Sequence, residues 1–143
     1  MKLVDANVLL YAVDDESPNH SAANGWLDGA LAGGEAIGFA WVVVLAFLRL
    51  STHPRLSARP LNVEEAADLV EQWLEEPPAV VVHPGGRHLS LLRGLLTALG
   101  TGANLVTDAH LAALAVEHGA EIVSFDRDFQ RFEGVRWSLP QAG

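Results

Sequence analysis

Short apolar runs alternate with longer stretches of helical periodicity along the whole chain. KLVD at residues 2–5 predicts a short strand, and AIGF, EIVSF and VRWSL predict further strands, the last of them at an edge of a sheet. AVVVH at residues 79–83 is continuously apolar, as is typical of strands that a parallel sheet buries on both faces. The strands are therefore short, and most of them are expected in the interior.

The segments between these strands predict helices. ANVLLYAVD follows the first strand directly, and Pro18 opens a second helix that Gly33 and Gly34 end. The later helices are AWVVVLAFLRLST, the amphipathic segment 63–74, the segment 89–99 closed by Gly100, the small-residue segment TDAHLAALAVEH capped by Gly119, and the short turn DRDFQRF. Strands that alternate with helices predict one three-layer α/β domain over residues 1–143, with a central parallel sheet.

Composition narrows the class of protein. The 143 residues include no cysteine, which excludes disulfide scaffolds and thiolate metal sites. Asp5 and Asn7 interrupt what would be the apolar segment of a secretory signal. The longest uncharged apolar run, residues 36–48, is shorter than the ~20 residues that span a bilayer. We therefore expect a soluble cytoplasmic protein without a membrane partner.

The charge balance argues against an ordinary nucleic-acid binder. The formal net charge is −9, and Lys2 is the only lysine. Phosphate affinity comes mostly from Lys and Arg, so a nucleic-acid function would need the acids to be gathered where metal cations neutralise them, or a basic protein partner.

Three separate acids follow or adjoin the predicted strand ends. Asp5 ends the first strand, Asp126 ends EIVSFD with Asp128 two residues on, and Asp108 begins the small-residue helix. Sites in open α/β sheets form beyond the carboxyl ends of the strands. Carboxylates gathered there repel one another unless a cation such as Mg²⁺ neutralises them. Such an ion would activate water for phosphodiester hydrolysis.

Each of these residues also has an ordinary structural explanation. Asp5 and Asn7 can cap a helix, Asp108 can be a first-turn acid, and Asp126 and Asp128 can be turn residues. These explanations leave unexplained why three acids converge on one edge of one sheet.

Other acidic or α/β families lack their signatures here. A receiver domain needs a late lysine, a dinucleotide-binding domain needs GxGxxG after the first strand, and a serine hydrolase needs GxSxG; none is present. The six histidines have no metal-ligand spacing such as HExxH.

Three blocks of sequence, VDANVLLYAVD, AWVVVLAFLRLSTHPR and LVTDAHLAALAVEHGAEIVSFDRDFQRFEGV, resemble PIN-domain ribonucleases, and more narrowly the VapC-type toxins of bacterial toxin–antitoxin pairs. The resemblance implies that Asp5, Asp108 and Asp126 are the catalytic and metal-binding acids, with Asn7 and Asp128 in supporting roles. It also implies a Mg²⁺ (or Mn²⁺) cofactor, endonucleolytic cleavage of RNA, a homodimer and an inhibitory cognate antitoxin. An antitoxin segment carrying Arg would compete with the metal at the acids, and Arg49, Arg55 and Arg59 are candidates for RNA backbone contacts.

One position departs from the family pattern. Many PIN domains have a glutamate in the third helix, where this chain has Ala46. Either three acids suffice, or Glu35 or Asp128 compensates, or activity is weakened. The alternative function is therefore a catalytically weak PIN domain that acts as an RNA-binding or protein-interaction module.

Overall fold

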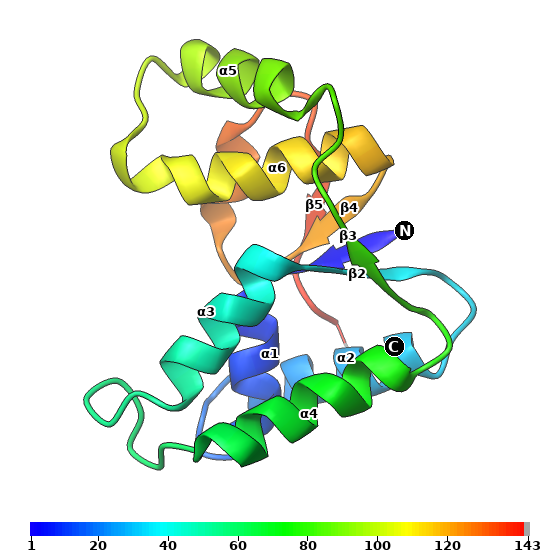
Figure 1. The fold of residues 1–143 in the computed structure, drawn as a ribbon, viewed down its shortest axis with the longest axis vertical. Coiled ribbons are helices and arrows are strands. Elements are labelled where there is room, and N and C mark those ends of the chain that lie inside the picture. The colour runs from blue at the N-terminus through cyan, green and yellow to red at the C-terminus, as the bar shows by residue number, and fades with distance from the viewer. Residues whose placement is uncertain (142–143) are drawn as a thin grey trace.

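A computed structural model describes residues 1–141, and five parallel strands lie at its centre (Figure 1). Their order across the sheet is β3-β2-β1-β4-β5. The strands are β1 (Lys2–Val4), β2 (Ile37–Ala40), β3 (Ala79–Val82), β4 (Glu121–Val123) and β5 (Trp137–Ser138). β1 is central, with Leu3 opposite Gly38 of β2 on one side and opposite Ile122 of β4 on the other.

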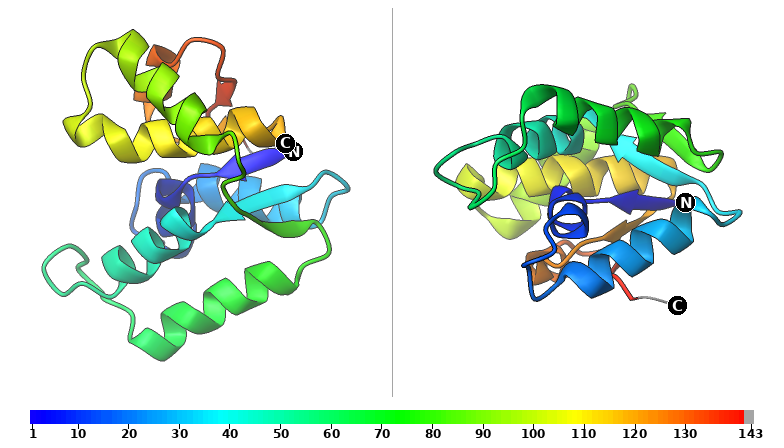
Figure 2. Two further views of the ribbon diagram at one scale, coloured as in Figure 1. Left: turned by 45° about the horizontal axis from the view of Figure 1, so that its top comes forward. Right: turned by 90° about the horizontal axis from the view of Figure 1, so that it is seen from below.

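Helices cover both faces of this sheet. The helices are α1 (Ala6–Val13), α2 (His20–Leu31), α3 (Trp41–Ser51), α4 (Val63–Glu75), α5 (His88–Leu99) and α6 (Val106–His118), with short 3-10 helices η1 (Ala103–Leu105) and η2 (Arg127–Arg131). Figure 1 shows α1 to α4 on one side of the strands and α5 and α6 on the other. In Figure 2, seen from below, α1 lies between α2 and α3. The predicted three-layer α/β architecture is confirmed.

Local sequence signals set several of the helix ends. Asp5 caps α1 by accepting a hydrogen bond from the Ala6 amide through Oδ1 at 2.8 Å. Asn62 and Glu65 form a reciprocal capping box at the start of α4. Gly119 ends α6 in the left-handed conformation at φ 63°, as the sequence predicted.

Helix α6 is the most deeply packed helix. Six of its residues are buried: Ala109, Leu111, Ala112, Ala113, Leu114 and Ala115. Small alanines allow α6 to lie close to its neighbours, and α5 packs over its outer side. The position of α6 matters for function because Asp108 lies in its first turn.

One predicted strand environment is wrong. The apolar run AVVVH was expected to be buried on both faces, but β3 lies at the edge of the sheet and is partly exposed. Val80 and Val81 are each 38% exposed. An apolar run favours a strand but carries no information on strand order, and here the crossover through α3 and α4 places β3 outermost.

In the part of the chain that the structure describes, residues 1–141, no helix has both the length and the apolar character needed to cross a bilayer.

Candidate active site

The predicted acids lie at the edge of the sheet formed by the carboxyl ends of the strands. Asp5 directly follows β1, and Asp126 follows β4, the neighbouring strand. The Asp5 amide extends this pairing by donating to the Val123 carbonyl at 3.0 Å. Asp108 reaches the group from the first turn of α6.

Mutual repulsion shows in the pKa of Asp108. Burial and the charges of Asp126, Asp5 and Asp128, in that order, raise the pKa of Asp108 to about 6. Burial is also the largest cause of a raised pKa at Asp5, to which the charge of Asp126 adds. The structure therefore brings three carboxyl groups, one at the end of β1 and two in the segment after β4, within electrostatic range of Asp108 in α6.

A buried serine that the sequence analysis did not single out joins two of these acids. Ser124 is fully buried, and its hydroxyl donates to Asp5 Oδ2 at 2.7 Å. The Ser124 hydroxyl oxygen in turn accepts hydrogen bonds from Asn7 Nδ2 at 3.0 Å and from the Asp126 amide at 2.9 Å. A hydroxyl offers one donor and two acceptor sites, so this one is fully used. Its bond to Asp5 favours the charged carboxylate and opposes the effect of burial on the Asp5 pKa.

Asn7 and Asp128 also contact the group. Asn7 Nδ2 lies 3.4 Å from Asp5 Oδ2, and its Oδ1 accepts from the Phe125 amide at 3.1 Å. Asp126 Oδ1 accepts from the Asp128 amide at 2.8 Å, which caps η2. These contacts link the end of β1 to the segment that follows β4.

The donor set suits a hydrated divalent ion. Within residues 1–141, no three His, Asp or Glu side chains are placed to enclose a metal ion by themselves. Mg²⁺ commonly keeps several waters and takes only one or two protein carboxylates. The repulsion that raises the Asp108 pKa is the condition that such a cation relieves. The carboxylate oxygens of Asp5, Asp108 and Asp126 are of the kind that Mg²⁺ or Mn²⁺ binds, and they would fit such an ion held partly through water.

In the third helix, at the position where many PIN domains have a fourth acid, this chain has Ala46. Ala46 is a half-buried residue of α3. Glu35 cannot compensate, because it precedes β2 at the opposite, amino edge of the sheet and binds the Met1 ammonium group at 3.2 Å. Asp128, the other residue expected to compensate, does add negative charge near Asp108, together with Asp126 and Asp5.

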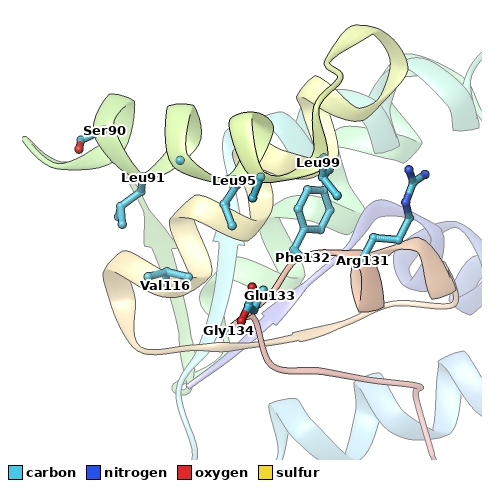
Figure 3. Close-up of a pocket in the computed structure, with 11 residues that line it drawn as sticks. Ser90, Leu91, Leu95, Leu99, Val116, Arg131, Phe132, Glu133 and Gly134 are labelled. Atoms are coloured by element: carbon cyan, nitrogen blue, oxygen red, sulfur yellow. The ribbon is translucent and has the colours of Figure 1, made fainter.

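One cavity of the molecule lies apart from the carboxylates. This cavity, of about 470 Å³, lies between α5, α6 and residues 131–134. Figure 3 shows the residues that line it. Its walls are mainly Leu91, Leu95, Leu99, Val116 and Phe132, and none of the acids discussed above lines it.

Comparisons with known proteins agree with this arrangement. The PIN domain family matches residues 2–135. Ribonuclease VapC37 of Mycobacterium tuberculosis is 60% identical over 142 residues, covering 99% of both chains, and Ribonuclease VapC33 of the same species is 40% identical over 98% of both. The crystal structure of VapBC2 from Rickettsia felis, bound to a DNA fragment from their promoter, contains a chain of the same fold, with a TM-score of 0.70 and 14% identity over 96% of this chain and 97% of that one. The resemblance read from the sequence is confirmed: this chain belongs to the PIN domain family and, within it, to the VapC ribonucleases.

Proposed function

We propose that this protein is a metal-dependent endoribonuclease, the toxin of a VapBC-type toxin–antitoxin pair, and that one PIN domain over residues 1–143 carries the activity. The observation that supports it best is the convergence of Asp5, Asp108 and Asp126 at one edge of the sheet, where burial and the neighbouring carboxylates raise the pKa of Asp108. The 60% identity to Ribonuclease VapC37, over 99% of both chains, supports RNA as the substrate.

The three acids have different surroundings and therefore different tasks. Asp5 is held rigidly by Ser124 and the Ala6 amide, so it is a fixed anchor for a divalent cation. Asp126 is tied to the same serine through its backbone amide. Asp108 accepts or releases a proton near neutral pH in the absence of a cation.

The cation supplies the chemistry that the carboxylates lack. When bound, Mg²⁺ or Mn²⁺ activates water and neutralises charge on the phosphate. The task of this chain is to gather the carboxylates, with Asn7 and Ser124 fixing their orientation and Asp128 adding negative charge.

The partners follow from the same family. Structures of VapBC complexes among those of the same fold support a cognate antitoxin for this chain. We also propose a homodimer, and action in the cytoplasm, where the RNA substrate and the antitoxin are made.

A cleavage assay with purified protein and structured RNA tests the proposal. We expect cleavage with Mg²⁺ or Mn²⁺, none after EDTA, and a loss of at least 100-fold in Asp5→Asn, Asp108→Asn and Asp126→Asn, the range seen when charge-stabilising groups are removed from enzyme sites. Asp28→Asn, an exposed acid of α2, is the control and should cleave normally. Cleavage that persists in EDTA would contradict the proposal.

Because Ala46 lacks the carboxyl group that many PIN domains have at this position, it favours a second candidate function. In that case the protein is an RNA-binding or protein-interaction module with little catalytic activity. RNA binding without cleavage at every metal concentration would support it. Restoration of cleavage by Ala46→Glu would show that the missing acid is the reason.

A further inference from the structure

The cavity between α5, α6 and residues 131–134 has no part in the proposed reaction, and its walls suit an apolar ligand. Leu91, Leu95 and Leu99 recur every fourth residue, so they form one row along α5, roughly 12 Å long. Val116 of α6 and the buried ring of Phe132 form the facing wall. Figure 3 shows the row of leucines above these two side chains. The cavity is therefore an elongated slot with apolar sides, called here the α5–α6 slot.

Small residues keep the α5–α6 slot open. Gly94 and Ala98 lie between the leucines on the face of α5 that lines it. A Cβ added at Gly94 would meet no other atom within 4 Å. No residue of α5, residues 88–99, is buried, although the helix is rich in leucine. Apolar surface that is left half-exposed gains free energy when it is covered, so the slot offers both space and a driving force for an apolar occupant.

The amino end of α5 is fixed to the last turn of α6, which holds the two walls of the slot in place. Glu117 Oε1 accepts from the Gly85 amide at 2.7 Å, and His118 Nε2 donates to the His83 carbonyl at 2.9 Å. A Cβ at Gly85 would lie 2.6 Å from Glu117 Oε2, so only glycine allows the carboxylate this close approach. The slot is therefore preformed at this end.

A guanidinium group lies at the other end of the slot. Arg131 lines the cavity, and Figure 3 shows its side chain at the Leu99 end of the row. Among residues 1–141, which the structure describes, no carboxylate forms an ion pair with Arg131. Glu133 also lines the cavity, but Figure 3 shows it beside Gly134, away from the guanidinium. A ligand carboxylate is therefore attracted to the Leu99 end and repelled from the side of Glu133.

We propose that the α5–α6 slot binds an unbranched aliphatic carboxylate, with its alkyl chain along the leucine row and its carboxylate on Arg131. Decanoate, when extended, spans this row. The inference goes beyond the proposed function, because neither the acids of the candidate site nor RNA takes part in it. Helix α6 carries Asp108 in its first turn, and η2, which Arg131 ends, begins after Asp126. A ligand in the slot therefore joins two elements that adjoin the candidate site, and it should raise Tm.

Calorimetric titration with decanoate tests the proposal, in EDTA, without RNA and below the concentration at which decanoate forms micelles. We expect saturable binding of one molecule per chain. Hexanoate should bind roughly tenfold or more weakly, because it covers less of the apolar wall. Decylammonium should also bind more weakly than decanoate, although the net charge of −9 attracts cations. Absence of saturable decanoate binding, or equal or tighter binding of decylammonium, would overturn the assignment.

Two variants place the ligand in the slot. Gly94→Leu fills the open space, so it should raise the Kd of decanoate roughly tenfold, and it should also raise Tm because leucine favours a helix more than glycine does. Loss of binding through misfolding would instead lower Tm. Arg131→Gln should raise the Kd roughly two- to fivefold, as expected for an exposed ion pair.

Matched controls come from the same helix. Arg93→Gln and Leu89→Asn change exposed residues of α5 that do not line the slot, and both should leave the Kd unchanged. Equal weakening in Arg93→Gln and Arg131→Gln would overturn the role of Arg131. A lowered Tm or an unchanged Kd in Gly94→Leu would overturn the slot itself. Because RNA is absent throughout, failure of the proposed nuclease function and failure of this proposal are separate results.

Discussion

At the residue scale, the feature with the widest consequences is the buried hydroxyl of Ser124. It connects Asp5, Asn7 and the Asp126 backbone through three hydrogen bonds of 2.7–3.0 Å. Without it, a partly buried carboxylate would lose its shortest hydrogen bond, and the segment after β4 would lose its tie to the end of β1. Ser124 is therefore a positioning residue for the acids.

Ser124→Ala should reduce RNA cleavage by at least tenfold and destabilise the protein by about 1–3 kcal/mol, because it leaves a buried carboxylate oxygen without its donor. Urea unfolding and single-turnover cleavage measure the two effects. Ser138→Ala is a matched control, since Ser138 also donates to a carboxylate, Glu121 Oε1 at 2.6 Å, and that carboxylate pairs with Lys2 and takes no part in the candidate site. Equal loss of cleavage in both variants would contradict the positioning role.

Asp108→Asn should make the metal-free protein more stable at pH 7 while abolishing cleavage. The charged carboxylate is disfavoured there by burial and by three neighbouring acids, and the neutral amide removes that repulsion. Thermal unfolding in EDTA checks the increase. The exposed acid Asp68 of α4 supplies the comparison: Asp68→Asn should leave both properties nearly unchanged, and a destabilised Asp108→Asn protein would contradict the electrostatic explanation.

The acids of the site could be predicted from the sequence because each adjoins a recognisable strand end or helix start. Ser124 could not be predicted in the same way. A serine between a strand and a turn is common, and its importance arises only when β1 and β4 are paired in register with Val4 opposite Val123. Glu35 was wrongly expected to be able to compensate for the missing acid at Ala46 for a similar reason. The sequence does not say at which edge of the sheet an acid lies.

At the scale of elements, helix ends depend on single residues with special backbone conformations. Gly119 occupies the left-handed region at φ 63°, where a side chain is disfavoured, and it ends the helix that carries Asp108. The helices could be predicted from the periodicity of their apolar residues, and the end of α6 could be predicted from Gly119. The place of β3 could not, because an apolar run of four residues fits an inner or an edge strand equally well.

Gly119→Ala should lower the free energy of unfolding by about 1 kcal/mol, because alanine resists this conformation. Gly29→Ala is the opposite case: Gly29 lies within α2 and a Cβ there meets nothing within 4 Å. It should stabilise the protein by up to about 1 kcal/mol. Denaturant unfolding of both variants checks the prediction, and a shift of the same sign in the two would contradict it.

At the scale of the whole molecule, the high negative charge argued against nucleic-acid binding. Because acids gather at the candidate site, we expect the stability of the protein to depend on divalent cations and on pH. The charge of −9 is not spread evenly, since the charges of three acids act on Asp108 at the candidate site. The net charge can be read from the sequence, but its concentration at the carboxyl edge of the sheet is a result of the fold. Stability should therefore change with pH and with divalent ions in a linked way.

The metal-free protein should lose the contribution of Asp108 to stability as pH rises. The folded pKa of about 6 lies above the ordinary 3.8, so the folded state binds this proton more tightly than the unfolded state. The contribution is fully present below pH 3.8 and is lost as pH rises through about 6. Mg²⁺ should correspondingly raise Tm more at pH 7.5 than at pH 5.5, where protons compete with it.

His110 titrates nearby with the opposite sign, because burial and the neighbouring His88 lower its pKa. The measurement is therefore the difference between wild type and Asp108→Asn across pH 4–8, in which the His110 contribution largely cancels. A flat difference across this range, or a Mg²⁺ effect that is the same in both proteins, would contradict the link between repulsion and metal binding.

The central position of β1 has a consequence for how the protein is made. Asp5 emerges first from the ribosome, but the serine that orients it lies 119 residues later. At about 5–20 residues per second, roughly 6 to 24 seconds separate the synthesis of the two. Until then the nascent chain holds the first acid of the proposed nuclease without Ser124 or Asp126. The pairing of β1 with β4 thus delays assembly of the site until the segment after β4 has been made.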